Sequence, residues 1–89
     1  MTTRDVRVTN ALGMHARAAA RFVNAAARFQ ASIRVGRDRT STDGKSILGL
    51  LLLSARRGVV LTISAEGPDE ATAVESLARL VDMGFGESS

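Results

Sequence analysis

The only histidine of the chain, His15, lies in the stretch LGMHARAAARF, two residues before Arg17. A neutral imidazole is a nucleophile whose ring nitrogen can accept a phosphoryl group and pass it on. The guanidinium group of Arg17 can bind phosphate oxygens with several donors at once. The chain has no cysteine, and neither a second histidine nor a carboxylate stands beside His15 in the sequence, so we expect no catalytic triad and no metal site. The alternative is a surface histidine that caps a helix and has no chemistry.

The residues after His15 have the apolar spacing of an amphipathic helix. Apolar side chains recur at intervals of three and four residues from Ala16 to about Phe29, so His15 falls at or near the N-cap. The first amides of a helix have no partners within the helix, and they create a positive potential that disfavours a charged imidazole. We therefore expect a neutral ring beside phosphate-binding backbone N–H groups of Ala16, Arg17 and Ala18.

The composition is typical of one compact domain over residues 1–89, with 45% hydrophobic and 24% charged residues. We expect a cytoplasmic protein, because no apolar run approaches the ~18–20 residues of a membrane span and no signal-peptide pattern is present. The net charge of +3 permits acidic partners without singling out nucleic acid. A small RNA-binding α/β module is a less favoured alternative, because tryptophan and tyrosine, which could stack on bases, are absent.

Hydropathy patterns predict elements in the order β-α-β-β-α-β-α. Strands are expected at residues 4–9, 32–35, 39–42 and 59–64. Helices are expected at residues 16–29, from Ser46 through ILGLLLL, and after Asp69, which is expected to be the N-cap of the last helix. In the last helix, Phe85 is expected to join the apolar face of Val74, Leu77 and Val81. This order predicts an α+β fold in which the helices cover one face of a mainly antiparallel sheet.

The run SILGLLLL, residues 46–53, has more apolar side chains than one buried helix face requires. The hydroxyl of Ser46 is expected to cap this helix. Three side chains suffice for the core: Ile47, Leu50 and Leu53. The others are expected to form an exposed partner-docking patch near His15, with deeper burial as the alternative: Leu48, Leu51 and Leu52. One side of the first helix would supply a basic and polar rim to this patch: Arg21, Asn24 and Arg28.

The two motifs together resemble a known family. The stretch LGMHARAAARFV, followed about thirty residues later by DGKSILGLLLLSARRG, is similar to the histidine-containing phosphocarrier (HPr) proteins of the phosphoenolpyruvate-dependent phosphotransferase system. The similarity spans nearly the whole chain. It implies an open-faced β-sandwich, in which a four-stranded antiparallel sheet is covered by three helices.

The resemblance also implies a function and partners. His15 would take a phosphoryl group on its Nδ1 atom from phosphorylated enzyme I and pass it to a histidine on an enzyme IIA domain. Arg17 matches the arginine that steadies the phosphoryl group in this family. Such a protein is a carrier without turnover of its own, and we expect a monomer that needs no cofactor.

Two further positions bear on regulation. Many family members have a proline after the arginine, where this chain has Ala18. This departure leaves open a regulatory or nitrogen-related branch that signals by its phosphorylation state, beside a role in sugar uptake. In some members the serine that matches Ser46 is phosphorylated by an ATP-dependent kinase, so a kinase or phosphorylase acting on Ser46 is a further expected partner.

Overall fold

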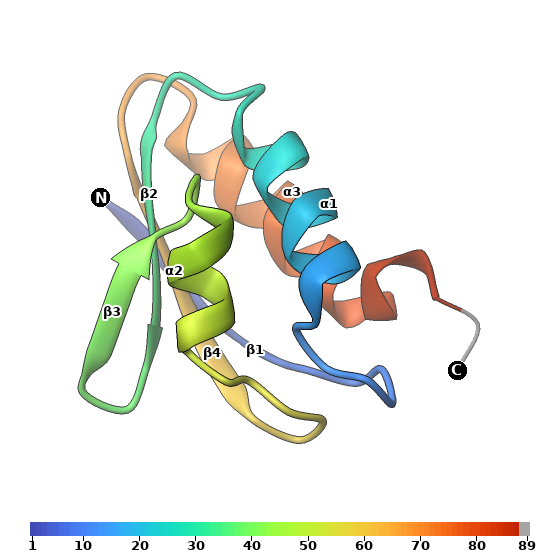
Figure 1. Cartoon of the computed structure of the whole chain (residues 1–89). Helices are drawn as coiled ribbons and strands as arrows, with labels where there is room; N and C mark the ends of the chain where they lie inside the picture. Colours follow the sequence, from blue (N-terminus) through green and yellow to red (C-terminus); the bar gives the residue numbers. More distant parts are fainter. Residues whose placement is uncertain (88–89) are drawn as a thin grey trace.

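The computed structural model describes residues 1–87, in which three helices lie on one side of a four-stranded sheet (Figure 1). The elements follow the predicted order, with one short 3-10 helix added at the end. They are β1 (Thr2–Arg7), α1 (Ala16–Ala26), β2 (Ser32–Arg37), β3 (Thr40–Asp43), α2 (Ile47–Leu52), β4 (Val60–Glu66), α3 (Glu70–Asp82) and η1 (Gly84–Gly86). No helix within these residues is both long enough and apolar enough to cross a membrane.

The strands are arranged in the order β1-β4-β2-β3, and all three neighbouring pairs are antiparallel. Side chains alternate between the two faces of a strand, and in β4 the buried ones are Leu61, Ile63 and Ala65. These residues face the helical layer, which covers them with apolar side chains of α1 and α3 such as Phe22 and Leu77. The predicted α+β architecture is confirmed.

The boundaries of most elements differ from the prediction by one or two residues, and those of β1 and α1 differ in ways that bear on the site. β1 begins two residues earlier and ends at Arg7 rather than at residue 9. α1 ends at Ala26 and not at Phe29, because the amide of Phe29 bonds the carbonyl of Ala26, three residues back. Such tighter turns keep the apolar spacing of a helix for one more turn. The Nζ atom of Lys45 also donates to the carbonyl of Phe29, at 2.9 Å.

Two predictions for the last helix are wrong in detail. Asp69 occupies the N-cap position of α3, but its carboxylate does not cap that helix. Instead it accepts hydrogen bonds from the amides of Gln30 and Ala31, each at 2.9 Å, which ties the α1–β2 loop to α3. These hydrogen bonds, of which the one from Gln30 has the largest effect, lower the pKa of Asp69. Phe85 is buried as predicted, but it lies in η1 beyond the end of α3 and has a φ of 58°.

Candidate functional site

His15 stands at the N-cap of α1, as the sequence predicts. Its backbone is extended, with φ −78° and ψ 178°, and its carbonyl accepts a bond from the amide of Ala19 at 2.8 Å. Its side chain makes no capping hydrogen bond, so the imidazole does not satisfy the first amides of α1. The side chain is 26% exposed and therefore reachable from solvent.

The loop between β1 and α1 fixes the direction of His15. Gly13 adopts a φ of 65°, and its carbonyl accepts a hydrogen bond from the amide of His15 at 2.9 Å. The amide of Met14 donates to the carbonyl of Ala55 at 2.8 Å, which anchors the loop to the segment after α2. A Cβ atom at residue 13 would lie 2.5 Å from that same carbonyl oxygen, so only glycine fits without rearrangement.

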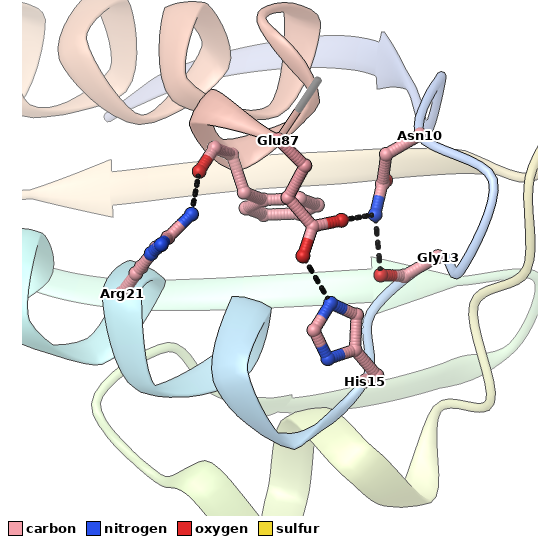
Figure 2. Close-up of polar contacts among 6 residues, drawn as sticks. Asn10, Gly13, His15, Arg21 and Glu87 are labelled. Atoms are coloured by element: carbon pink, nitrogen blue, oxygen red, sulfur yellow. Dashed lines mark hydrogen bonds and ion pairs between the residues drawn. The ribbon is translucent and has the colours of Figure 1, made fainter. Parts of the chain in front are cut away.

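A carboxylate from the other end of the chain contacts the imidazole. The Nε2 atom of His15 faces the Oε2 atom of Glu87, which is 72 residues away in sequence (Figure 2). The other carboxylate oxygen of Glu87 accepts a hydrogen bond from the side-chain amide of Asn10 at 2.7 Å. The expectation that no carboxylate lies beside His15 is thus wrong in space, although it holds along the sequence.

Glu87 is held by its partners rather than by the sheet. Its side chain is 13% exposed. The hydrogen bond from Asn10, followed by that with His15, lowers the pKa of Glu87, so the carboxylate is ionised at neutral pH. Asn10 is buried and its Nδ2 atom also donates to the carbonyl of Gly13, at 2.9 Å. No sequence periodicity could reveal this cluster, because its members come from opposite ends of the chain.

The other predicted phosphate-binding groups surround the start of α1. Arg17 is exposed and makes neither an ion pair nor a side-chain hydrogen bond within residues 1–87. Ala16 is exposed as well, whereas Ala18 is fully buried. Nδ1 of His15 is turned away from Glu87 (Figure 2), and no hydrogen bond to it is found within the described residues. Among residues 1–87, the site thus presents a ring nitrogen and a guanidinium group without partners, next to the start of a helix.

Comparison with known proteins decides the family. The family model described as "PTS HPr component phosphorylation site" matches residues 2–83. The chain belongs to the HPr family. HPr proteins from Pseudomonas aeruginosa and Neisseria meningitidis (serogroup A) are 41% and 37% identical to it, and each alignment covers 98% of both chains. The crystal structure of HPr-C-His from Thermoanaerobacter tengcongensis, 38% identical, matches with a TM-score of 0.95 over 100% of both chains. The chain is accordingly a phosphocarrier of the phosphotransferase system rather than an enzyme.

Beside α1 in this HPr fold lies α2, which carries the predicted docking patch (Figure 1). Leu48 and Leu52 are 68% and 73% exposed, as predicted. Leu51, in contrast, is half-buried and packs against the core. Ile47, assigned to the core, is 42% exposed, because it begins a helix of only six residues whose buried face is centred on Leu50.

The predicted rim residues are all exposed, but only Arg21 and Asn24 lie on α1. Arg28 lies in the turn that follows, because α1 ends at Ala26. Arg21 has an additional contact that the sequence does not predict. Its Nη1 atom donates to the carbonyl of Phe85 at 2.6 Å, so it also holds the C-terminal segment (Figure 2).

Ser46 occupies the N-cap of α2 and its hydroxyl accepts a hydrogen bond from the amide of Gly49 at 3.0 Å. The predicted capping role is therefore confirmed. Ser46 is half-buried, two residues before the exposed Leu48 of the docking patch.

Proposed function

We propose that His15 accepts a phosphoryl group on Nδ1 from phosphorylated enzyme I and transfers it to a histidine of an enzyme IIA domain. The observation that carries this proposal is the position of the ring. It stands at the N-cap of an eleven-residue helix, its side chain is 26% exposed, and neither ring nitrogen makes a capping hydrogen bond to that helix. Transfer between two histidines needs both rings to approach one phosphorus atom from opposite sides. The partly exposed imidazole, whose Nδ1 atom is turned away from Glu87, permits this (Figure 2).

The phosphoryl group would be stabilised by groups of the first turn of α1. The amides of Ala16 and Arg17 precede the first helical hydrogen bond, and both residues are exposed. Backbone N–H groups and the helix dipole favour an anion at this end. Arg17 has no competing partner among residues 1–87 and can turn its guanidinium group toward phosphate oxygens. Because Ala18 is fully buried, its amide could contribute only if the first turn opened, so Ala16 and Arg17 are the main donors.

Partner docking would use Leu48 and Leu52 of α2, with Leu51 at the edge of the patch. The exposed Arg21 and Asn24 of α1, with Arg28 in the turn just beyond it, would provide a basic and polar rim to the patch. A small apolar centre with a basic rim suits short encounters with acidic partner surfaces, because charge speeds association while a small interface allows fast release. Enzyme I and enzyme IIA domains would share this surface, and the protein would act as a cytoplasmic monomer that leaves the patch uncovered.

Phosphorylation of Ser46 by a kinase would regulate the same surface. A phosphate here adds nearly two negative charges two residues before Leu48, at the margin of the docking patch. The start of α2 tolerates this charge, whereas an acidic partner would be repelled. The role of Ser46 as an N-cap, with its hydroxyl bonded to the amide of Gly49, explains why the residue serves the fold even without modification.

The transfer is tested by incubating the protein with purified enzyme I and phosphoenolpyruvate labelled in its phosphate. We expect an acid-labile label on the wild type and none on His15→Ala. Arg17→Ala should slow labelling, whereas Arg79→Ala, which removes an exposed arginine on α3, should not. An acid-stable label, or one that persists in His15→Ala, would refute the proposal. Loss of the label on adding an enzyme IIA domain tests the second half of the transfer.

The docking surface is tested separately by Leu52→Asp, which places a negative charge in the patch without opening the core. We expect labelling by enzyme I to need a higher carrier concentration, with an unchanged urea midpoint. Ser76→Asp adds the same charge to an exposed position of α3 and is the matched control. Equal effects of the two variants would exclude a special role for the patch.

A further inference from the structure

Residues 84–87, which we call the strap, bring a carboxylate against His15. Three consecutive residues have positive φ: Gly84 (64°), Phe85 (58°) and Gly86 (78°). A positive φ is unfavourable for a residue with a side chain, so Phe85 must be held there by its surroundings. Its ring is buried, and its carbonyl accepts a hydrogen bond from Arg21 at 2.6 Å. The strap lies beyond residue 83, where the match to the family model ends.

The strap delivers the carboxylate of Glu87 in one orientation (Figure 2). Oε1 accepts from the buried Nδ2 of Asn10 at 2.7 Å, and Oε2 faces Nε2 of His15. Asn10 cannot present its oxygen instead, because its Nδ2 also donates to the carbonyl of Gly13. An ionised carboxylate can only accept hydrogen bonds, so the ring nitrogen that faces it carries a hydrogen atom. In a neutral imidazole the lone pair then belongs to Nδ1.

We propose that Glu87 is a positioning residue that holds His15 in the Nε2–H tautomer and thereby makes Nδ1 the nitrogen that accepts the phosphoryl group. This inference rests on the proposed function, because it explains which atom of the carrier histidine reacts. Asn10 orients the carboxylate, and Arg21, through the carbonyl of Phe85, holds the strap that carries it.

The transfer step then needs no proton to leave His15. The lone pair of Nδ1 forms a bond to phosphorus, the N–P bond of the donor histidine breaks, and its electron pair stays on the donor ring. Because Nε2 keeps its hydrogen, the product is a positively charged phosphoimidazolium. Its Nε2–H faces the Glu87 carboxylate, and a hydrogen bond between two opposite charges is stronger than one to a neutral ring. Glu87 therefore also stabilises the phosphorylated carrier.

Glu87→Gln is the most informative variant. Asn10 offers only N–H groups, so the amide oxygen of the glutamine must turn toward Asn10 and its NH₂ group toward His15. Nε2 must then accept, and the hydrogen atom moves to Nδ1. The ¹⁵N chemical shifts of the imidazole, measured on unphosphorylated protein at a pH where the ring is neutral, report the tautomer directly. We expect mainly Nε2–H in the wild type, mainly Nδ1–H in Glu87→Gln, and a mixture in Glu87→Ala.

The matched control is Glu75→Gln, which changes an exposed carboxylate on α3 and should leave the tautomer as it is. Arg21→Ala keeps Glu87 but frees the strap, and should shift the tautomer in the same direction as Glu87→Ala, by less. A wild-type tautomer in Glu87→Gln, with the dispersed amide spectrum of a folded protein, would overturn the proposal. This measurement needs no phosphate, so it stands apart from any failure of transfer from enzyme I.

The phosphorylated state gives a second readout. At equilibrium with enzyme I and a limiting amount of phosphoenolpyruvate, the ratio of phosphorylated to free carrier should fall by about two- to tenfold in Glu87→Gln, because the paired charge is lost. Glu75→Gln should match the wild type. An unchanged ratio in Glu87→Gln would refute stabilisation of the phosphoimidazolium. Absence of label from the wild type itself would instead refute the proposed function.

Discussion

Replacing Gly13 by alanine tests whether the loop between β1 and α1 fixes the orientation of the His15 side chain. At this residue φ is 65°, and an added Cβ atom would lie 2.5 Å from the carbonyl oxygen of Ala55 and 2.9 Å from the Cα atom of Arg56. Both are backbone atoms, so no flexible side chain can move aside. The oxygen of Ala55 is also fixed by its 2.8 Å hydrogen bond from the amide of Met14. The loop that carries His15 must therefore shift.

The expected loss of stability has two parts. A left-handed backbone costs a residue with a side chain about 1–2 kcal/mol. Forcing a methyl group into a closely packed site costs about 1–3 kcal/mol more. Gly13→Ala should therefore lower the free energy of unfolding by about 2–5 kcal/mol, out of a total that is about 5–15 kcal/mol for small domains. Gly58→Ala provides the control, because Gly58 has a φ of 93° but a Cβ atom there would have no neighbour within 4 Å.

Urea unfolding followed by circular dichroism should show the loss of about 1–2 kcal/mol in Gly58→Ala and a clearly larger one in Gly13→Ala. In the folded fraction, Gly13→Ala should also accept the phosphoryl group from enzyme I more slowly, because the amide of His15 bonds the carbonyl of residue 13. Equal losses in the two variants would show that the close approach to Ala55 is not what requires glycine. Unchanged labelling in Gly13→Ala would show that this loop does not aim the imidazole.

The remaining predictions concern stability and are all measured by urea unfolding. Leu50→Ala, which empties a fully buried site, should cost about 2–5 kcal/mol, whereas Leu52→Ala at an exposed site should cost less than about 0.5 kcal/mol; similar losses would contradict the assigned burial. Ser46→Ala should cost about 1 kcal/mol by removing the cap of α2, and no loss would show that the cap is dispensable. Hydrogen bonds from Thr2 first, and then from the N-terminal ammonium group, lower the pKa of Glu70 from 4.5 to about 2. Because the pKa of Glu70 is lower in the folded protein than in the unfolded chain, the ionised carboxylate stabilises the fold above pH 4.5, and this stabilisation is lost as the pH falls toward 2. Glu70→Gln should therefore reduce the decline of the urea midpoint between pH 4.5 and pH 2. An equal decline in the wild type and the variant would contradict this prediction.

Local signals were sufficient for the elements that carry the reactive groups. The regular apolar spacing after His15 identifies α1. Because this spacing begins at Ala16, His15 is placed at the start of the helix. The serine before ILGLLL similarly marks the beginning of α2, where the hydroxyl of Ser46 does cap the helix. These features depend on residues within one turn of each other, so a linear pattern contains them.

Features that depend on neighbours in space were misjudged. Asp69 stands where a helix cap belongs, yet its carboxylate binds the amides of Gln30 and Ala31, because packing brings the α1–β2 loop within reach. Ile47 was predicted to be buried and is exposed, whereas Leu51 was predicted to be exposed and packs against the core. The orientation of α2 against the core decides which of its apolar side chains are covered.

The sequence by itself determined the order of the elements, the helix that begins at the histidine, and the presence of Arg17 two residues after His15. Only the tertiary structure brought Glu87 against that histidine. The contact joins residues 72 positions apart and depends on η1, which packs against α1. A side chain at the end of a chain has no periodic relation to one near its beginning, so the packing of Phe85 and the bonds from Asn10 and Arg21 decide where it lies.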